Sequence, residues 1–171
     1  MEDSYYGPIK KILEKEFGKL GKCYFEITAK GKISNEIKSL LDDLALYIIN
    51  VERFSPDIMG CVIKGFMDKP INEILSNKKE LVVVEVKPKI KIKDIYQAKQ
   101  YGEIFNAKYT LLIYIEPMPE EIRRFLRKRA VILSHSAGYQ RVAIVQFDKE
   151  TGKIKNDSWF GLSPFEEEDL F

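Results

Sequence analysis

The segment 81–87, Leu-Val-Val-Val-Glu-Val-Lys, limits most narrowly what this chain can fold into. A short valine-rich run of this kind is typical of a strand buried inside a sheet. Because side chains alternate along a strand, Glu85 and Lys87 share one face, whereas Val84 and Val86 share the other. A buried carboxylate or ammonium costs several kcal/mol unless it is paired. We therefore expect Glu85 and Lys87 to belong to a site rather than to the core.

Helices and strands alternate on either side of this segment. Apolar residues at helical spacing predict helices over residues 8–20, 34–50, 93–107 and 119–129. Apolar or alternating runs predict strands over 22–30, 57–66, 81–87, 109–116 and 130–134, and a C-terminal hairpin made of 141–148 and 154–159. Residues 68–79 are expected to form a short helix or a connection. This order predicts an α/β domain with a mixed sheet, and a length of 171 residues suits one domain.

Several classes of protein are excluded by composition and by missing motifs. No apolar run approaches the roughly 18–20 residues that cross a bilayer, and the start of the chain has no apolar signal core. We therefore expect a cytoplasmic protein with no membrane partner. Cys23 and Cys61 are far apart in the sequence and lack metal-ligand spacing, and without an export signal we expect them to be reduced thiols. His135 is the single histidine, which leaves it no partner for zinc or a catalytic triad. Glycine-rich phosphate loops are also absent from the sequence.

Charge is distributed unevenly along the chain. Without the acids at 166–169, the chain has 28 basic residues against 22 acidic ones, a net charge of about +6. Basic runs at 87–93 and 123–129 could contact phosphates. The candidates for nucleic-acid contact are Lys89, Lys91, Lys93, Arg123 and Arg127. An equally good interpretation is a solvated surface on a protein rich in lysine and glutamate.

Asp57 opens the strand that precedes the valine-rich segment. If the two strands pair as a hairpin around residues 65–79, Asp57 and Glu85 approach each other at one end. Two close carboxylates repel each other unless a cation lies between them, and a hard ion such as Mg²⁺ prefers these oxygens. A metal bound there can lower the pKa of a water and neutralise charge on a phosphate. Lys87 would orient or activate that water, or act as a fixed positive charge.

Gln97 and Tyr101 add two polar groups on one face of the predicted helix at 93–107, because they are four residues apart. Gln97 could hydrogen-bond the attacking water, and Tyr101 could donate its hydroxyl to a phosphate. The alternative for this pair is an exposed glutamine beside a half-buried tyrosine.

Taken in order, Pro56-Asp57, Glu85-Val86-Lys87 and Gln97 to Tyr101 resemble the PD-(D/E)xK nuclease superfamily. The last pair is similar to the glutamine–tyrosine motif of its RecB-like branch. This resemblance, over about residues 55–115, implies a restriction-endonuclease-like mixed sheet flanked by helices, with a core at about 8–116 and an extension at 117–171 that adds a C-terminal hairpin. It also implies Mg²⁺ or Mn²⁺ held by Asp57, Glu85 and the carbonyl of Val86. The implied activity is hydrolysis of DNA phosphodiester bonds, leaving a 5′-phosphate.

The chain also departs from the pattern of that family. Many relatives carry another acid on the first helix, and here Glu14 and Glu16 compete for that place. The cysteines that bind an iron–sulfur cluster in some relatives are missing. One alternative is a nuclease-like domain that binds nucleic acid or a protein partner without cutting, and another is an unrelated scaffold in which Glu85 and Lys87 form a structural ion pair. A homodimer, which small nucleases often use to cut both strands, remains open.

Overall fold

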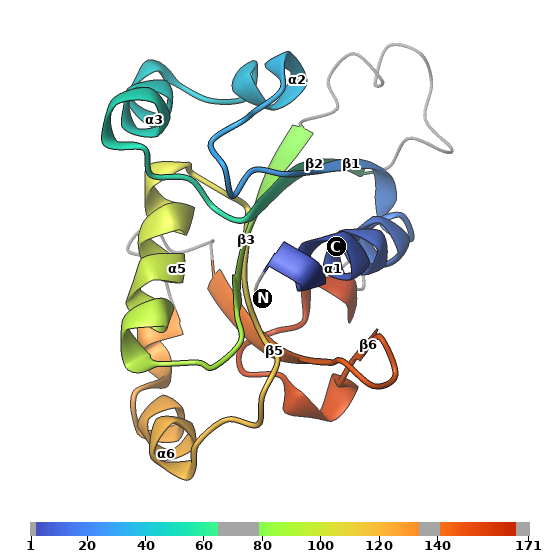
Figure 1. The fold of residues 1–171 in the computed structure, drawn as a ribbon, viewed down its shortest axis with the longest axis vertical. Coiled ribbons are helices and arrows are strands. Elements are labelled where there is room, and N and C mark those ends of the chain that lie inside the picture. Colours follow the sequence, from blue (N-terminus) through green and yellow to red (C-terminus); the bar gives the residue numbers. More distant parts are fainter. Residues whose placement is uncertain (1–2, 65–78, 134–140, 167–171) are drawn as a thin grey trace.

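The computed structural model describes residues 3–64, 79–133 and 141–166, and their strands form one mixed sheet between helices (Figure 1). The strands lie side by side in chain order: β1 (Gly21–Ile27), β2 (Ile58–Lys64), β3 (Lys79–Lys87), β4 (Tyr109–Tyr114), β5 (Arg141–Asp148) and β6 (Lys153–Ile154). The pairs β1–β2, β2–β3 and β5–β6 are antiparallel, whereas β3–β4 and β4–β5 are parallel. The prediction of an α/β fold with a mixed sheet is confirmed.

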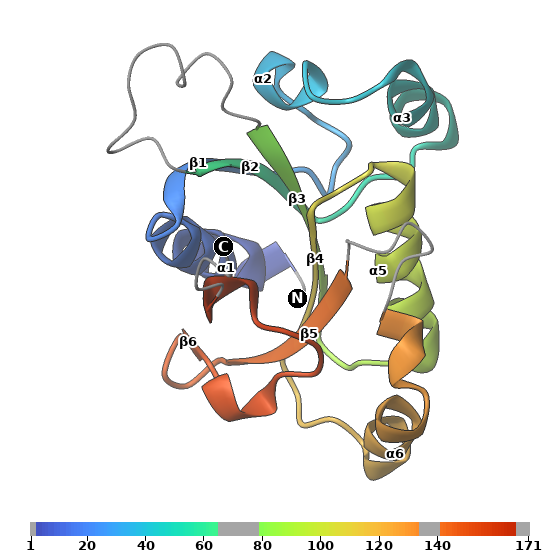
Figure 2. The same ribbon diagram turned by 180° about the vertical axis from the view of Figure 1, so that it is seen from behind.

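Helices cover both faces of this sheet, as Figures 1 and 2 show from opposite sides. Helix α1 (Asp3–Phe17) packs its apolar stripe on one face, against Val82, Val84 and Val86 of β3. Helices α5 (Ile92–Ile104) and α6 (Glu120–Lys128) cover the opposite face. Because the side chains of β3 alternate, its even-numbered valines point toward α1, and Val83 points toward α5. Glu85 therefore lies on the α5 face of a strand that is buried on both sides.

The predicted helix over 34–50 is wrong as a single helix. It is divided into α2 (Asn35–Lys38), α3 (Asp43–Tyr47) and a π-helical turn at Ile48–Glu52. The reason is a second N-terminal cap: the Asp42 carboxylate accepts a hydrogen bond from the Ala45 N–H at 2.8 Å and starts α3 anew. The Ser34 hydroxyl caps α2 by accepting a hydrogen bond from the Ile37 N–H at 3.4 Å.

Three other element predictions need correction. Residues 130–133 of the predicted strand 130–134 form a 3₁₀ helix (Ala130–Leu133). The predicted hairpin at 141–159 exists, but its second strand has two residues, and β5 also pairs with β4 over six residue pairs, so the hairpin is part of the sheet rather than an addition to it. Helix α1 begins five residues before the predicted start, with Pro8 inside it. Residues 65–78 lie outside the described part, and the division at residue 116 stays a prediction.

No helix in the described part of the chain is both long and apolar enough to cross a bilayer.

Candidate active site

The predicted site residues meet where β2 begins and β3 continues past it. The register pairs Ile58 with Val84, which brings Asp57, in the bend before β2, level with Glu85 of β3. The predicted hairpin pairing of these two strands is therefore confirmed. Past this point β3 runs on to Lys87 beside β4. Because β2 begins only at Ile58, the part of β3 beyond Val84 has a bend rather than a strand on that side.

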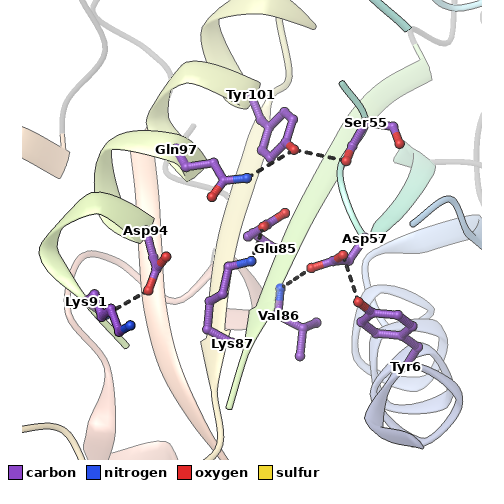
Figure 3. Close-up of polar contacts among 10 residues, drawn as sticks. All are labelled: Tyr6, Ser55, Asp57, Glu85, Val86, Lys87, Lys91, Asp94, Gln97 and Tyr101. Atoms are coloured by element: carbon purple, nitrogen blue, oxygen red, sulfur yellow. Dashed lines mark hydrogen bonds and ion pairs between the residues drawn. The ribbon is translucent and has the colours of Figure 1, made fainter. Parts of the chain in front are cut away.

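The backbone and the side chain of Asp57 are both fixed by hydrogen bonds, and Figure 3 shows those of the side chain. One carboxylate oxygen, Oδ2, accepts from the Val86 N–H at 2.8 Å, and Oδ1 accepts from the Tyr6 hydroxyl at 2.9 Å. Its carbonyl accepts from the N–H groups of Thr28 and Ala29 at 2.8 and 3.1 Å. The side chain of Asp57 is buried. Helix α1, strand β3 and the turn after β1 therefore hold this carboxylate in one place.

Glu85 and Lys87 point toward α5, as their spacing predicts (Figure 3). Glu85 is 3% exposed, and its Oε1 lies 2.7 Å from the Lys87 Nζ. The Lys87 side chain is 21% exposed, so its ammonium stands between the buried acid and solvent. The Lys87 ammonium therefore places a hydrogen-bond donor and a positive charge on the solvent side of Glu85.

Burial affects the pKa of Asp57. Burial raises the pKa of Asp57 above its ordinary value, and the hydrogen bonds from Val86 and Tyr6, the charge of Lys87 and a hydrogen bond with Glu85 oppose that rise. Glu85 thus lies close enough to Asp57 to affect this pKa. Because burial is the largest cause, the ionised form of Asp57 is less favourable in the protein than in water. A cation placed between the acids would relieve that cost.

The donor set fits a hard divalent ion. Mg²⁺ commonly binds through one or two carboxylates and keeps several waters, so two acids and a carbonyl suffice. In a strand the N–H and C=O of one residue point to the same side, so the Val86 carbonyl faces the side from which its N–H contacts Asp57. A richer cage is not available within the described residues, where no group of three or more His, Cys, Asp or Glu could hold a metal.

Tyr101 and Gln97 of α5 lie beside this pair and face each other. The Gln97 Nε2 donates to the Tyr101 hydroxyl at 3.2 Å, and that hydroxyl donates to the Ser55 carbonyl at 3.0 Å. The ring packs against Phe54 with centroids 4.3 Å apart. Burial, followed by the charge of Glu85, raises the pKa of Tyr101 to about 12. Since a hydroxyl has one hydrogen, Tyr101 in this arrangement anchors the segment that leads to Asp57, and it would have to leave Ser55 to donate to a phosphate.

The five basic candidates for nucleic-acid contact lie away from α1. Lys89, Lys91 and Lys93 are exposed in the connection from β3 into α5, and Lys89 forms an ion pair with Glu116 at 3.5 Å. Arg123 and Arg127 face the same way on α6, as predicted, and both contact Glu120, at 3.5 and 3.6 Å. Both arginines are thus already paired with the Glu120 carboxylate. The three lysines instead follow the C-terminal end of β3, the strand that carries Glu85.

The first helix reaches the site through Tyr6 rather than through an acid. Glu14 pairs with Lys10, and Glu16 pairs with Lys19, each at 2.7 Å. These acids are eight and ten residues beyond Tyr6, about 12 and 15 Å along the helix axis at 1.5 Å per residue. Sequence reasoning missed Tyr6 because the helix was expected to begin at residue 8. The signal was present, since Tyr6 continues the apolar stripe of Ile9, Leu13 and Phe17 by one turn.

No protein-family model matches the sequence, and no curated protein matches it. The functional conclusion therefore depends on the chemistry of the site itself.

Proposed function

We propose that this chain is a metal-dependent DNA nuclease of the PD-(D/E)xK type with a restriction-endonuclease-like fold. The observation that carries the proposal is the buried pair of Asp57 and Glu85 at the start of β2, where the Lys87 ammonium lies 2.7 Å from Glu85. A chain gains nothing in stability from burying two acids together, since each must be desolvated and they repel. Apart from α2, α3 and the π-helical turn between β1 and β2, the order of elements is a helix, three antiparallel strands, a helix and a parallel strand, which supports the same fold.

Each residue has a distinct part in the proposed reaction. Asp57, Glu85 and the Val86 carbonyl would hold Mg²⁺ or Mn²⁺, which when bound lowers the pKa of a water and neutralises phosphate charge. Lys87 donates a hydrogen bond to the attacking water and keeps a positive charge beside the phosphate. Water attacks phosphorus, the bond to the 3′ oxygen breaks, and the proton passes to that oxygen, which gives a 5′-phosphate and a 3′-hydroxyl. Gln97 positions the water, and Tyr101 keeps the segment before Asp57 in place.

DNA is the proposed partner, and the basic connection at Lys89, Lys91 and Lys93 would contact its backbone. A homodimer that cuts both strands and a cytoplasmic location belong to the same proposal.

The test compares Glu85→Gln with Glu116→Gln, which removes a carboxylate that also pairs with a lysine but lies outside the pair of acids. We expect Glu85→Gln to reduce the rate of cutting of plasmid and oligonucleotide DNA by roughly 10²–10³-fold, the loss typical of a charge-stabilising group. Glu116→Gln should cut as fast as wild type. Isothermal titration should show Mn²⁺ binding to the wild type and the control, and none to Glu85→Gln.

Two results would overturn the nuclease assignment. Equal cutting by Glu85→Gln and wild type would place the activity elsewhere. Mn²⁺ binding that needs Glu85, in a protein that cuts no form of DNA, would favour the second function: a nuclease-like domain that binds nucleic acid or a protein without cutting.

A further inference from the structure

A cleft of about 290 Å³ lies beside the candidate active site, between the start of α1 and the turn that follows β1. Its lining consists of Asp3, Tyr6, Ile27, Ala29, Lys30 and Lys32. The volume is near the lower end of the range of about 300–1,000 Å³ found for ligand pockets. It suits one unit of a polymer, such as a single nucleotide, rather than a large ligand. The reaction described above makes no use of this cleft.

Two residues of the lining also hold Asp57. The Tyr6 side chain forms one wall, and its hydroxyl donates to the Asp57 carboxylate at 2.9 Å. Ala29 forms part of another wall, and its N–H donates to the Asp57 carbonyl at 3.1 Å. The turn is fixed further by the Thr28 hydroxyl, which donates to the Pro56 carbonyl at 2.6 Å. The cleft therefore has a fixed position next to the carboxylate pair.

The chemistry of the cleft combines an apolar wall with a positive rim. Ile27 is 43% exposed although it is a large aliphatic residue, and it lines the cleft together with the buried Tyr6. Lys30 and Lys32 bring two ammonium groups to the rim against one carboxylate, that of Asp3. The Lys30–Asp3 contact is long, 4.0 Å, and both side chains are largely exposed, so water and salt screen it. An apolar surface for a base beside cations for a phosphate is how proteins bind single nucleotides of a strand.

We propose that this cleft binds the nucleotide next to the phosphate that is cut, with its base against Ile27 and its phosphate at Lys30 and Lys32. The proposal rests on the nuclease function proposed above and adds a substrate-binding subsite on the α1 side of the sheet. The basic connection at 89–93 leads into α5, on the other side (Figure 1). A bound strand would therefore cross the end of the sheet from one helix layer to the other.

The experiment reverses the charge of the rim and compares it with an equal reversal elsewhere. Lys30→Glu/Lys32→Glu is tested against Lys149→Glu/Lys153→Glu, which changes exposed lysines around the β5–β6 turn. Fluorescence anisotropy with a labelled oligonucleotide in EDTA should show a dissociation constant about 10-fold higher for the cleft variant. The slope of log Kd against log salt should fall by about 1–2, one unit per lost phosphate contact. The control should stay within about 2-fold of wild type, and thermal melting should confirm that all variants fold.

A third variant moves the affinity in the opposite direction. Asp3→Asn removes the acid at the rim, so we expect tighter binding of DNA, by about 2–3-fold at low salt. Loss of affinity in Asp3→Asn, or equal behaviour of the cleft variant and its control, would overturn the subsite.

Failure of the subsite and failure of the nuclease function give different results. If wild type cuts DNA, Glu85→Gln does not, and the cleft variant keeps wild-type KM and Kd, only the subsite is wrong. If wild type cuts nothing with Mg²⁺ or Mn²⁺ while the cleft variant binds DNA more weakly than its control, the nuclease function is wrong and nucleotide binding in the cleft stands.

Discussion

Tyr6 and Val86 supply the two donors that make a buried carboxylate at position 57 tolerable. Each of these donors lowers the pKa of Asp57, and burial raises it by more. Hydrogen bonds to both carboxylate oxygens thus hold Asp57 in place, although burial still makes its ionised form less favourable than in water. Such a residue is expected at a site whose natural state includes a cation, because selection for stability alone would have replaced it.

A pH series on Asp57→Asn tests this balance. An acid whose pKa is raised by folding binds its proton more tightly in the folded protein, so stability is lost as pH rises from the unfolded pKa through the folded pKa. The free energy of unfolding of wild type, relative to Asp57→Asn, should therefore fall as pH rises from about 4 toward neutrality in metal-free buffer. The asparagine keeps both contacts, because its oxygen can accept from Val86 and its amide can donate to the Tyr6 oxygen. Denaturant melts at several pH values measure the difference.

Asp57→Ala serves as the contrast in that series. It leaves the buried Val86 N–H and Tyr6 hydroxyl without their acceptor, at about 1–3 kcal/mol for each unsatisfied group. We expect it to be less stable than wild type at every pH. A wild-type protein that gains stability over Asp57→Asn as pH rises would show that the pKa of Asp57 is lowered instead.

At the scale of elements, strand β2 positions Asp57, and Gly60 sets how β2 lies against β1. Gly60 pairs with Phe25, whose buried ring crosses the place where a side chain would be. A Cβ at residue 60 would lie 2.3 Å from that ring and 2.6 Å from the Tyr24 carbonyl oxygen. The glycine is therefore required by close packing.

Gly60→Ala should destabilise the protein by about 1–3 kcal/mol, the usual cost of overpacking a core. It should also weaken Mn²⁺ binding, because β2, which begins directly after Asp57, must shift. Denaturant melts and titration with Mn²⁺ measure the two effects, with Gly7→Ala in α1 as a control for glycine replacement where no atom lies within 4 Å of the added Cβ and φ is not positive. Unchanged stability in Gly60→Ala would mean that Phe25 moves aside at no cost.

Elements with strong local patterns were predictable from sequence, whereas those decided by competing local signals were not. The valine-rich β3 and the helix α5 carry periodic patterns that packing reinforces, so both were found. The 34–50 segment has a good apolar stripe, yet the Asp42 cap divides it. The 3₁₀ turn at 130–133 has strand-like residues that continue from α6 instead of joining the sheet.

The candidate site likewise contains residues that could be predicted from the sequence and residues that could not. Asp57, Glu85 and Lys87 were predictable because strand alternation and hairpin register are local rules. Tyr6 and the cleft at Lys30 and Lys32 depend on how α1 lies across the sheet, which is a tertiary property. Sequence spacing alone does not reveal it.

At the scale of the whole molecule, the two acids lie between the two helix layers that cover the sheet. Asp57 is bonded to α1 through Tyr6 and to β3 through Val86, and Glu85 faces α5. A cation held between these acids would therefore connect both helix layers through the sheet. Its binding energy would appear as stability of the entire fold, since a ligand that binds only the folded state adds RT ln(1 + [L]/Kd).

The melting temperature should accordingly rise with Mn²⁺ concentration. At 100 times the dissociation constant the gain is about 2.7 kcal/mol, which for a chain of this size corresponds to roughly 5–10 °C. Calorimetry on wild type and on Asp57→Asn/Glu85→Gln checks this, with Glu116→Gln expected to follow the wild type. The double variant should melt at a temperature independent of Mn²⁺, because both carboxylates are gone. An equal rise in the double variant would place the ion elsewhere, with the acids of the C-terminal sequence 166–169 as the next candidates, and would remove the metal from the proposed mechanism.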